Sequence, residues 1–213
     1  MQPLMKSKII QIITQANFNN EFIEYVKNEF PNEFTPLIEK PYQYDFPDNP
    51  LLNLSNKDRL FTLMYELIPL EMLFNKKRIP RSIFYDSLDD LNFRITRYKT
   101  NYGEYGISAR DALWLRFIYK MEIFDLGTLR FQKSYFSYAE IERQDYDFMP
   151  LSDEMKKRFP EGIPIINVHI QTDADLEEEK VSNSFKQAHD FFTTYFPEHP
   201  YKWCTCRTWM LYK

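Results

Sequence analysis

Apolar residues recur every three or four positions through the first part of the chain, and this spacing predicts a helical N-terminal region. Residues 4–30 follow the helical period, and a second stretch begins at Ser55. Further stretches with the same period cover residues 82–99 and Ala109–Phe124. One face of each stretch is apolar, as in helices that pack on a shared core. Residues 1–125 are therefore expected to form a mainly helical region.

Proline and serine residues mark the expected ends of these helices. Five prolines between residues 31 and 50 predict an extended connector that carries aromatic side chains. Pro69 interrupts the apolar stripe that begins at Ser55, so a kink or an end is expected there. Ser108 stands where a side-chain cap would start the helix of residues 109–124.

After Gly127 the apolar period changes from that of a helix to that of a strand. Leu129–Phe136 alternates as a half-buried strand does. Two further apolar segments, Ile165–Ile170 and Trp203–Leu211, flank an amphipathic helix that we expect to begin at Asp173. A strand, a helix and a strand in this order predict two parallel, neighbouring strands. The chain is therefore expected to be an α+β protein, with the helical region packed on a small mixed sheet within residues 126–213.

The charge and the composition exclude several classes of protein. The 27 basic and 31 acidic residues are spread along the chain, and the net charge of −4 provides no field that would gather nucleic acid or anionic lipid. No window approaches the roughly 18 apolar residues of a membrane span. Cys204 and Cys206 lie two apart on one predicted strand, so we expect reduced thiols and a cytoplasmic protein. Binding of nucleic acid, insertion in a membrane and a bound metal are not expected.

Several stretches of the second half carry a family resemblance. They are DLNFRITRY (Asp90–Tyr98), LGTLRFQ (Leu126–Gln132), GIPIINVHI (Gly162–Ile170), FFTTYFPEHPY (Phe191–Tyr201) and CRTWML (Cys206–Leu211). In this order they resemble a bacterial acyltransferase family that has a helical N-acyltransferase N-terminal domain and a GNAT-like C-terminal domain. The resemblance implies acyl transfer from an acyl thioester, acyl-CoA as the co-substrate, to an amine. It also implies a helix and two strands beyond the last stretch, so the sheet domain of residues 126–213 is expected to be incomplete relative to the family.

Two residues are candidates for catalysis. His169 is expected to share a strand face with Asn167, where a neutral imidazole would accept the proton of an attacking amine. The structural alternative is a core histidine that is hydrogen-bonded to a carbonyl group. Cys206 would be an acyl acceptor if His169 lay beside it, and the alternative is an inert cysteine. The predicted parallel pairing places His169 and Cys206 on adjacent strands.

Three residues are candidates for binding the acyl-CoA cofactor: Asn167, Arg130 and Arg207. The alternative for both arginines is a solvated position on the surface. The acidic segment from Asp173 to Glu179 would place carboxylates at a helix N-terminus, where related folds bind pyrophosphate. This segment predicts weak binding of acetyl-CoA in the usual pose.

The alternative function is a non-catalytic GNAT-like domain that binds a small ligand or a protein partner. The expected partners are thus a small-molecule substrate or a protein, and a second copy of the chain through its C-terminal strand. An apolar terminal strand at an open sheet edge would either pair in a homodimer or be covered. We favour a cover by the connector of residues 41–54, which is extended, apolar and long enough to span the end of a sheet.

Overall fold

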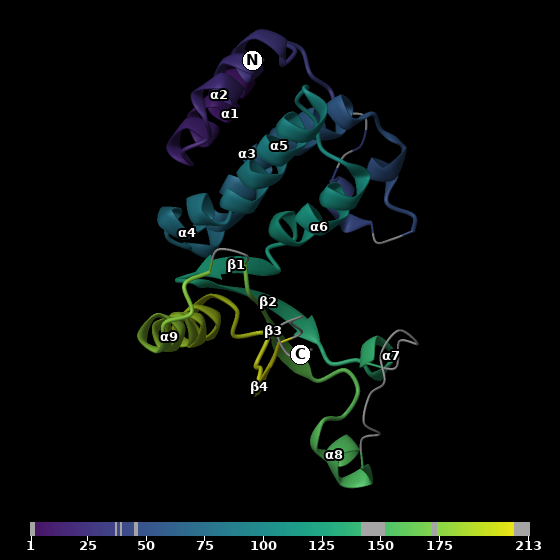
Figure 1. Cartoon of the computed structure of the whole chain (residues 1–213), viewed down its shortest axis with the longest axis vertical. Coiled ribbons are helices and arrows are strands. Elements are labelled where there is room, and N and C mark those ends of the chain that lie inside the picture. The colour runs from purple at the N-terminus through teal and green to yellow at the C-terminus, as the bar shows by residue number, and fades with distance from the viewer. Residues whose placement is uncertain are drawn as a thin grey trace. The chain divides into compact units, whose positions relative to one another are not determined.

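A computed structural model of the chain describes residues 3–36, 38, 40–44, 47–141, 152–171 and 174–206. The chain divides into two compact units, Met1–Phe124 and Asp125–Lys213, and strand β1 (Ile123–Leu126) crosses the boundary between them (Figure 1). Helices build the first unit, and a four-stranded mixed sheet builds the second. The α+β class predicted from the sequence is confirmed.

The helices of the first unit lie in the predicted apolar stretches, although the stretch of residues 82–99 is divided between two helices. They are α1 (Pro3–Gln15), α2 (Asn20–Glu29), α3 (Asn56–Lys77), α4 (Arg81–Asp86), α5 (Asp89–Tyr102) and α6 (Ala109–Tyr119). The Ser55 side chain accepts the backbone N–H of Asp58 at the start of α3, and Ser108 accepts that of Asp111 at the start of α6. Both serines thus satisfy N–H groups that a helix end leaves without a partner.

Helix α3 forms the centre of this unit and packs against α1, α4 and α6. The helix is 22 residues long with Pro69 inside it, so of the kink or end predicted at this proline, the end is wrong. The helix ends instead at Arg78, which adopts a left-handed conformation with φ of 58°. Lys8 of α1 forms an ion pair with the largely buried Glu71 of α3 at 2.7 Å, and this pair joins the two helices across their apolar contact.

The connector between α2 and α3 contains two short 3₁₀ turns, η1 (Pro41–Gln43) and η2 (Pro50–Asn53), which both pack on α6. The guanidinium group of Arg59 in α3 holds the end of the connector in place, because it donates hydrogen bonds to the carbonyl oxygens of Leu51 and Leu54 at 2.8 and 2.6 Å. The same guanidinium group donates to the carbonyl of Ile107 at 2.6 Å. This packing belongs to the helical unit. The prediction that the connector covers the terminal strand depends on residues 207–213, which lie outside the described part of the chain.

Helix α6 ends at Tyr119, so the prediction that it extends to Phe124 is wrong. Met121 has a φ of 53°, a left-handed conformation that a continuing helix cannot contain. The backbone N–H groups of Met121 and Glu122 close the helix end on the carbonyls of Ile118 and Phe117. The apolar segment that follows is short enough to serve either as a last helical turn or as a buried strand, and it forms β1.

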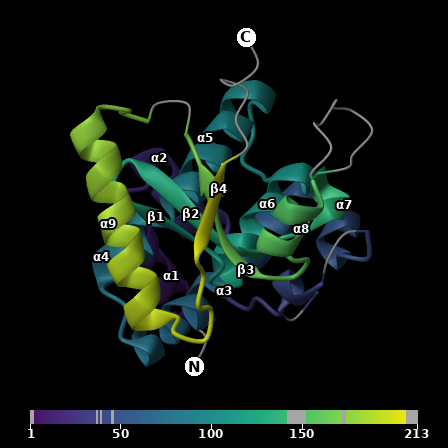
Figure 2. The same cartoon turned by 90° about the horizontal axis from the view of Figure 1, so that it is seen from below.

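The sheet has the strand order β1, β2, β3, β4, where β2 is Leu129–Tyr135, β3 is Pro164–His169 and β4 is Trp203–Cys206. Strands β2 and β3 are antiparallel and pair Gln132 with Asn167. Strands β3 and β4 are parallel and pair Val168 with Cys206 (Figure 2). The predicted parallel pairing of the strand with His169 and the strand with Cys206 is therefore confirmed.

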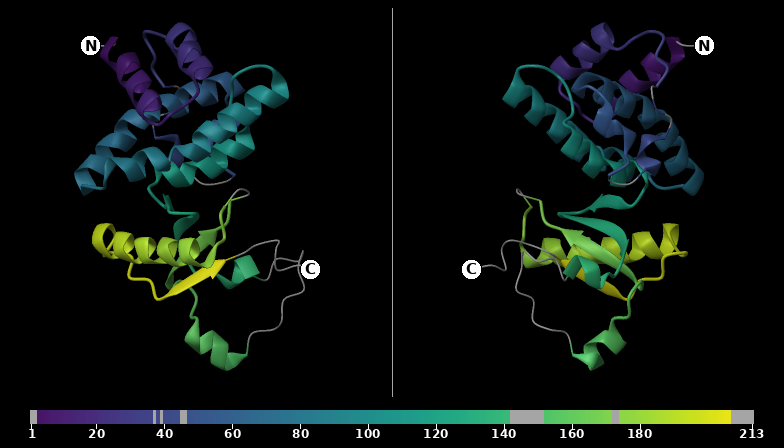
Figure 3. Two further views of the ribbon diagram at one scale, coloured as in Figure 1. Left: turned by 60° about the vertical axis from the view of Figure 1, so that its left-hand side comes forward. Right: turned by 90° about the vertical axis from the view of Figure 1, so that its right-hand side faces the viewer.

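Helix α9 (Glu178–Tyr195) covers one face of this sheet (Figures 2 and 3). The ring of Phe131 in β2 meets that of Phe185 in α9 at 5.5 Å. The ammonium group of Lys133 lies 3.9 Å from the centre of the Phe196 ring, just beyond the helix. Side chains at alternate positions of β2 therefore face α9, and the positions between them face away from it.

The helix between the parallel strands begins at Glu178, so its predicted start at Asp173 is wrong. The carboxylate of Asp175 accepts the backbone N–H of Glu177 at 3.1 Å, and it also forms an ion pair with Lys180. Lys180 forms a second ion pair with Glu177 at 3.1 Å. These contacts form a local turn ahead of the helix and balance part of the acidic charge there.

The segment between β2 and β3 contains α7 (Tyr138–Ile141) and α8 (Asp153–Arg158). The hydroxyl group of Tyr138 donates to the carbonyl of Phe159 at 2.6 Å, which ties the two ends of the segment together. The ring of Phe159 then packs on Trp203 of β4, with centres 4.8 Å apart.

Candidate active site on the sheet

Polar side chains gather on the sheet face that points away from α9. Residues that pair directly across neighbouring strands project to the same side. The register therefore places Gln132, Asn167 and Thr205 in one row across β2, β3 and β4. A second cross-strand pair, Arg130 and His169, continues the polar surface toward the end of β3.

His169 is half-buried at the end of β3, and its Nε2 lies 2.8 Å from Oε1 of Gln132. An amide oxygen accepts hydrogen bonds and cannot donate them. With Oε1 of Gln132 as the acceptor, the imidazole hydrogen lies on Nε2 and the basic lone pair on Nδ1. The imidazole is held in one orientation by a side chain that is itself only 8% exposed. The prediction that His169 shares its strand face with Asn167 agrees with the register.

Asn167 is held by the neighbouring strand, because its Oδ1 accepts the hydroxyl proton of Thr205. The hydrogen bond fixes the amide plane and aligns the Nδ2 donors. Thr205 is a half-buried member of the polar row that the sequence analysis did not single out. Thr205 stands between Cys204 and Cys206 along the strand, so its side chain projects to the face opposite theirs. This alternation is the signal in the sequence that could have identified it.

Arg130 lies nearly buried in the sheet and forms an ion pair with Asp125 of β1. The guanidinium group donates to both carboxylate oxygens of Asp125, with a distance of 2.8 Å between its second nitrogen and Oδ2. Gln171 donates to the same Oδ2 at 3.2 Å. A phosphate group would therefore have to compete with Asp125 for Arg130. The assignment of Arg130 to cofactor binding stays a prediction.

The other end of this face is apolar and aromatic. Ile165 of β3 pairs with Trp203 of β4, and Phe159 packs on the Trp203 ring. The guanidinium group of Arg158, the last residue of α8, lies 4.9 Å from the centre of that ring. The face thus combines a polar half around His169 with an apolar half around Trp203, a combination suited to a ligand with a reactive head and an apolar chain.

Cys204 and Cys206 point to the opposite face of the sheet. They pair with Ile166 and Val168, which alternate with Asn167 and His169 along β3. Both cysteines are exposed at the surface, and partial desolvation by neighbouring atoms raises the pKa of each thiol. His169 and Cys206 therefore occupy adjacent strands without facing each other, and the condition under which Cys206 would act as an acyl acceptor is not met.

Arg207, the third predicted cofactor contact, lies outside the described residues. Of the predicted site residues, the structure thus brings together Asn167, His169 and Arg130 on one face and places Cys206 on the other. Gln132 and Asp125 are additional members of the site that sequence reasoning missed. The period-two pattern of β2 places Gln132 on the face of Arg130, so the sequence carried a signal for Gln132.

Residues 123–213 match the family model of the GNAT-like C-terminal domain. The matched residues include the whole of the C-terminal unit. The predicted resemblance is confirmed for this unit, which holds all strands of the described sheet except the first two residues of β1.

Solved structures with a similar fold are acyltransferases. A mutant acyltransferase in complex with octanoyl-CoA has a TM-score of 0.67 and 14% identity, with 96% of this chain and 62% of that chain covered. An acyltransferase in complex with decanoyl-CoA has a TM-score of 0.64 and 16% identity, with 96% and 63% covered. A third acyltransferase, in complex with decanoyl-CoA and teicoplanin, has a TM-score of 0.65 and 14% identity, with 94% and 61% covered.

This chain spans less than two thirds of the length of those acyltransferases. At these identities the likeness shows the fold, including the helical region that precedes the GNAT-like domain. A search of curated protein sequences gave no match. Within the described residues, no helix is both long enough and apolar enough to cross a membrane, and no cluster of three or more His, Cys, Asp or Glu side chains would hold a metal ion.

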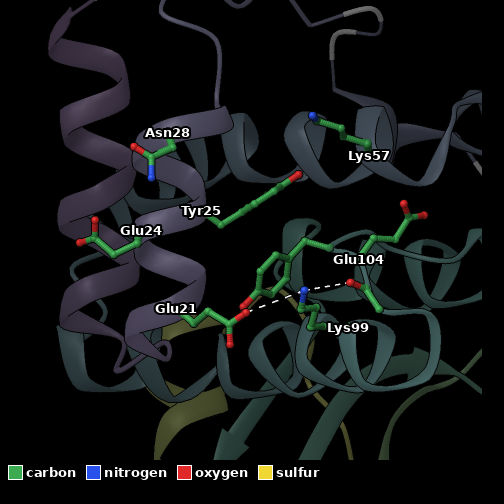
Figure 4. Close-up of a pocket in the computed structure, with 9 residues that line it drawn as sticks. Glu21, Glu24, Tyr25, Asn28, Lys57, Lys99 and Glu104 are labelled. Carbon is green, nitrogen blue, oxygen red and sulfur yellow. Dashed lines mark hydrogen bonds and ion pairs between the residues drawn. The ribbon is translucent and has the colours of Figure 1, made fainter.

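Two concave surfaces belong to the helical unit. One pocket of about 430 Å³ is lined by Tyr25, Tyr105 and charged side chains of α2, α3 and α5 (Figure 4). The other, of about 440 Å³, lies at the end of α5 and the start of α6. None of the predicted site residues lines either pocket.

Proposed function

We propose that the protein transfers an acyl group from acyl-CoA to an amine, with His169 as the general base. The observation that carries this proposal is the imidazole of His169, which Gln132 orients on the polar face of a GNAT-like sheet. Similar folds have been solved with octanoyl-CoA and decanoyl-CoA, which supports an acyl thioester as the donor.

The reaction needs one proton acceptor and one leaving thiol. The amine nitrogen attacks the thioester carbonyl carbon, a C–N bond forms and the C–S bond breaks. Nδ1 of His169 takes the proton that the nitrogen loses, while the hydrogen bond from Nε2 to Gln132 keeps the ring in place. The imidazolium then returns the proton to the departing sulfur, so CoA leaves as a thiol and the base is regenerated.

Asn167 would contribute by orienting the thioester. Its Oδ1 is occupied by Thr205, so its Nδ2 protons are the donors that remain for a carbonyl oxygen. A donor aimed at the developing negative charge lowers the barrier of acyl transfer. The apolar half of the face around Trp203 would accommodate the acyl chain. Because Cys206 faces the other way, we propose direct transfer with no cysteine-bound acyl intermediate.

The test uses the full chain with octanoyl-CoA and a primary amine, and it measures both binding of the thioester and release of free CoA thiol. We expect His169→Gln to lower the transfer rate by about 10²- to 10⁴-fold, the usual contribution of a positioned base, with little change in octanoyl-CoA affinity. The matched control is His189→Gln, because His189 is an exposed histidine on α9. Equal rates for the His169 variant and the wild-type protein would contradict the assigned base.

The alternative is a GNAT-like domain that binds a small ligand or a protein without catalysis. The ion pair of Arg130 with Asp125 and the acidic residues ahead of α9 favour it, because both weaken the attraction for a CoA phosphate. The two functions differ in one measurement. A non-catalytic domain would bind octanoyl-CoA or another ligand without releasing free thiol at any concentration of amine.

A further inference from the structure

The pocket at the end of α5 and the start of α6 carries an excess of positive charge that the proposed reaction does not use. Three arginines, Arg94, Arg97 and Arg110, line it with one carboxylate, Asp111. Arg94 also forms an ion pair with the nearly buried Asp90 at 2.8 Å, so two carboxylates stand against three arginines. Its volume of about 440 Å³ falls in the range of pockets that bind small molecules. The remaining lining residues are polar or aromatic rather than aliphatic, so the pocket suits a charged ligand.

Asp111 is already occupied by its own neighbours. Its Oδ1 accepts hydrogen bonds from Arg94 and Arg97, and its Oδ2 accepts a hydrogen bond from the hydroxyl group of Ser108 at 2.8 Å. Burial alone would raise the pKa of Asp111, but the hydrogen bonds from Ser108, Arg94 and Arg97 together lower it. The carboxylate therefore stays ionised and cannot balance a third arginine.

Arg97 and Arg110 keep donors available for a ligand. Arg97 is 45% exposed and gives one hydrogen bond, to Asp111 at 2.7 Å, although a guanidinium group has five N–H donors. Arg110 is exposed in the first turn of α6 and forms no hydrogen bond or ion pair with any residue in the described ranges. Guanidinium groups bind phosphate in a two-pronged geometry, so the pair fits a phosphate better than a monovalent anion.

An exposed aromatic ring lies at the rim of the same pocket. Tyr102 is 67% exposed, and its ring packs on that of Tyr98 with centres 4.6 Å apart. Tyr98 is buried and supports the Tyr102 ring, most of which remains exposed. Nucleobases stack on such rings. The pocket therefore offers phosphate donors and a stacking surface together.

The other pocket of the helical unit shows that this charge is specific to one place. It has a similar volume of about 430 Å³, but three carboxylates, Glu21, Glu24 and Glu104, line it against two lysines (Figure 4). Burial, and then the nearby Glu21, raise the pKa of Tyr105 in this pocket to about 12. A phosphate group would be repelled there and attracted to the arginine pocket, which is the one lined by Arg94, Arg97 and Arg110.

We propose that Arg97, Arg110 and Tyr102 form a site that binds the phosphomonoester and the base of a nucleotide. The site lies within the helical unit and does not depend on the proposed acyl transfer. Two kinds of ligand have both a base and a phosphomonoester. One is a free nucleotide, and the other is the nucleotide end of CoA, which has an adenine ring and a phosphomonoester.

The test is calorimetric titration of the full chain with AMP, inorganic phosphate and adenosine. We expect AMP to bind more tightly than phosphate and adenosine to bind far more weakly than AMP. Arg110→Gln should weaken AMP binding by about tenfold or more, because a charge-assisted hydrogen bond is lost. Tyr102→Leu should lower the AMP affinity toward that of phosphate and leave phosphate binding unchanged. Both side chains are exposed, so the variants should fold, as circular dichroism would verify.

Arg81→Gln is the matched control, since Arg81 is an exposed arginine of the same unit that does not line the pocket.

The AMP affinity should also rise between pH 5 and pH 7, because the phosphate group loses its second proton at about pH 6. The proposal is overturned if AMP does not bind, if Arg110→Gln binds AMP like the wild-type protein, or if adenosine binds as well as AMP. Titration with octanoyl-CoA identifies the source: Arg110→Gln weakens its binding if the nucleotide end of CoA occupies the pocket, and leaves it unchanged if a free nucleotide does.

Discussion

At the scale of single residues, Asp111 links two helices of the first unit through the arginines of α5 and the serine that caps α6. Its lowered pKa means that the folded state prefers the ionised carboxylate more strongly than the unfolded chain does. This preference stabilises the folded protein at pH values above about 4, which is the pKa of an aspartate in the unfolded chain. The stabilisation is lost as the pH falls through the lower pKa that Asp111 has in the folded state.

We expect Asp111→Asn to lower the free energy of unfolding at pH 7 by about 2–3 kcal/mol, because Arg94 and Ser108 lose a charged partner in a largely buried place. The variant should also lose less stability than the wild-type protein when the pH falls from 5 to 3. Urea unfolding at the two pH values measures both effects. Asp48→Asn, at an exposed aspartate of the same unit, is the control. The same pH dependence in both variants would contradict this role of Asp111.

The two cysteines give a second prediction at this scale. Because desolvation raises the pKa of Cys204 and Cys206, few of these thiols are ionised at neutral pH. Alkylation by iodoacetamide should therefore be slow at pH 7 and should accelerate at more alkaline pH than for a free cysteine. The double variant Cys204→Ser, Cys206→Ser should keep its rate of CoA release within about threefold, as expected of side chains outside the reacting face. A loss as large as that expected for His169→Gln would restore the cysteine mechanism.

At the scale of elements, the turn between β1 and β2 depends on a glycine that touches α9. Gly127 has a φ of 71°, and a Cβ atom there would overlap Oγ of Ser184. This hydroxyl accepts the backbone N–H of Thr128 at 2.8 Å and donates to the carbonyl of Lys180 at 3.0 Å. The serine therefore cannot move without breaking the contact that joins the turn to the helix.

Gly127→Ala should lower the free energy of unfolding by about 2–4 kcal/mol, from backbone strain plus the clash with Ser184. Gly162→Ala is the matched control, because Gly162 has a similar φ of 79° but open space around it. It should cost only about 1 kcal/mol, the strain alone. Chemical denaturation of both variants measures the difference, and equal losses would show that the contact with Ser184 is unimportant.

The elements also show what could be predicted from the sequence. Helical and strand periods identified α3, α5, β2, β3 and α9, because each has a clear apolar face. Strand β1 was missed because its four residues follow α6 after a turn made by Met121, which rarely adopts a positive φ. The start of α9 was misplaced because acidic residues such as those from Asp173 to Glu179 are typical of a first helical turn, whereas the carboxylate of Asp175 closes a turn ahead of the helix.

For the candidate site, the alternation along β3 placed Asn167 and His169 together correctly. The same alternation could not show that Cys206 lies on the other face, because that depends on the register between two strands that are 34 or more residues apart. The ion pair of Arg130 with Asp125 was equally hidden, because it requires the unpredicted strand β1. Residue types therefore suggested the chemistry, and the pairing of strands decided which residues share it.

At the scale of the whole molecule, β4 stands at the end of the strand order within the described part of the sheet. An edge strand exposes backbone groups that can pair with a second copy of the chain, which is the predicted alternative to an edge covered by residues 41–54. In the homodimer, light scattering would give twice the mass of the chain. Cys204→Lys, which adds a charge at this edge, should lower the dimer fraction, whereas Asn183→Lys on the exposed side of α9 should not. A constant monomer mass for the wild-type protein would contradict the dimer.

The division of the chain also has a consequence for its synthesis on the ribosome. The helical unit is contiguous in sequence, so all of its helices have been made before any of β2, β3 or β4 leaves the exit tunnel. Of the polar row, Gln132 and Asn167 emerge first, and Thr205 comes last. A nascent chain thus carries a finished arginine pocket well before it can present an aligned Asn167, and nucleotide binding would precede catalytic competence during translation.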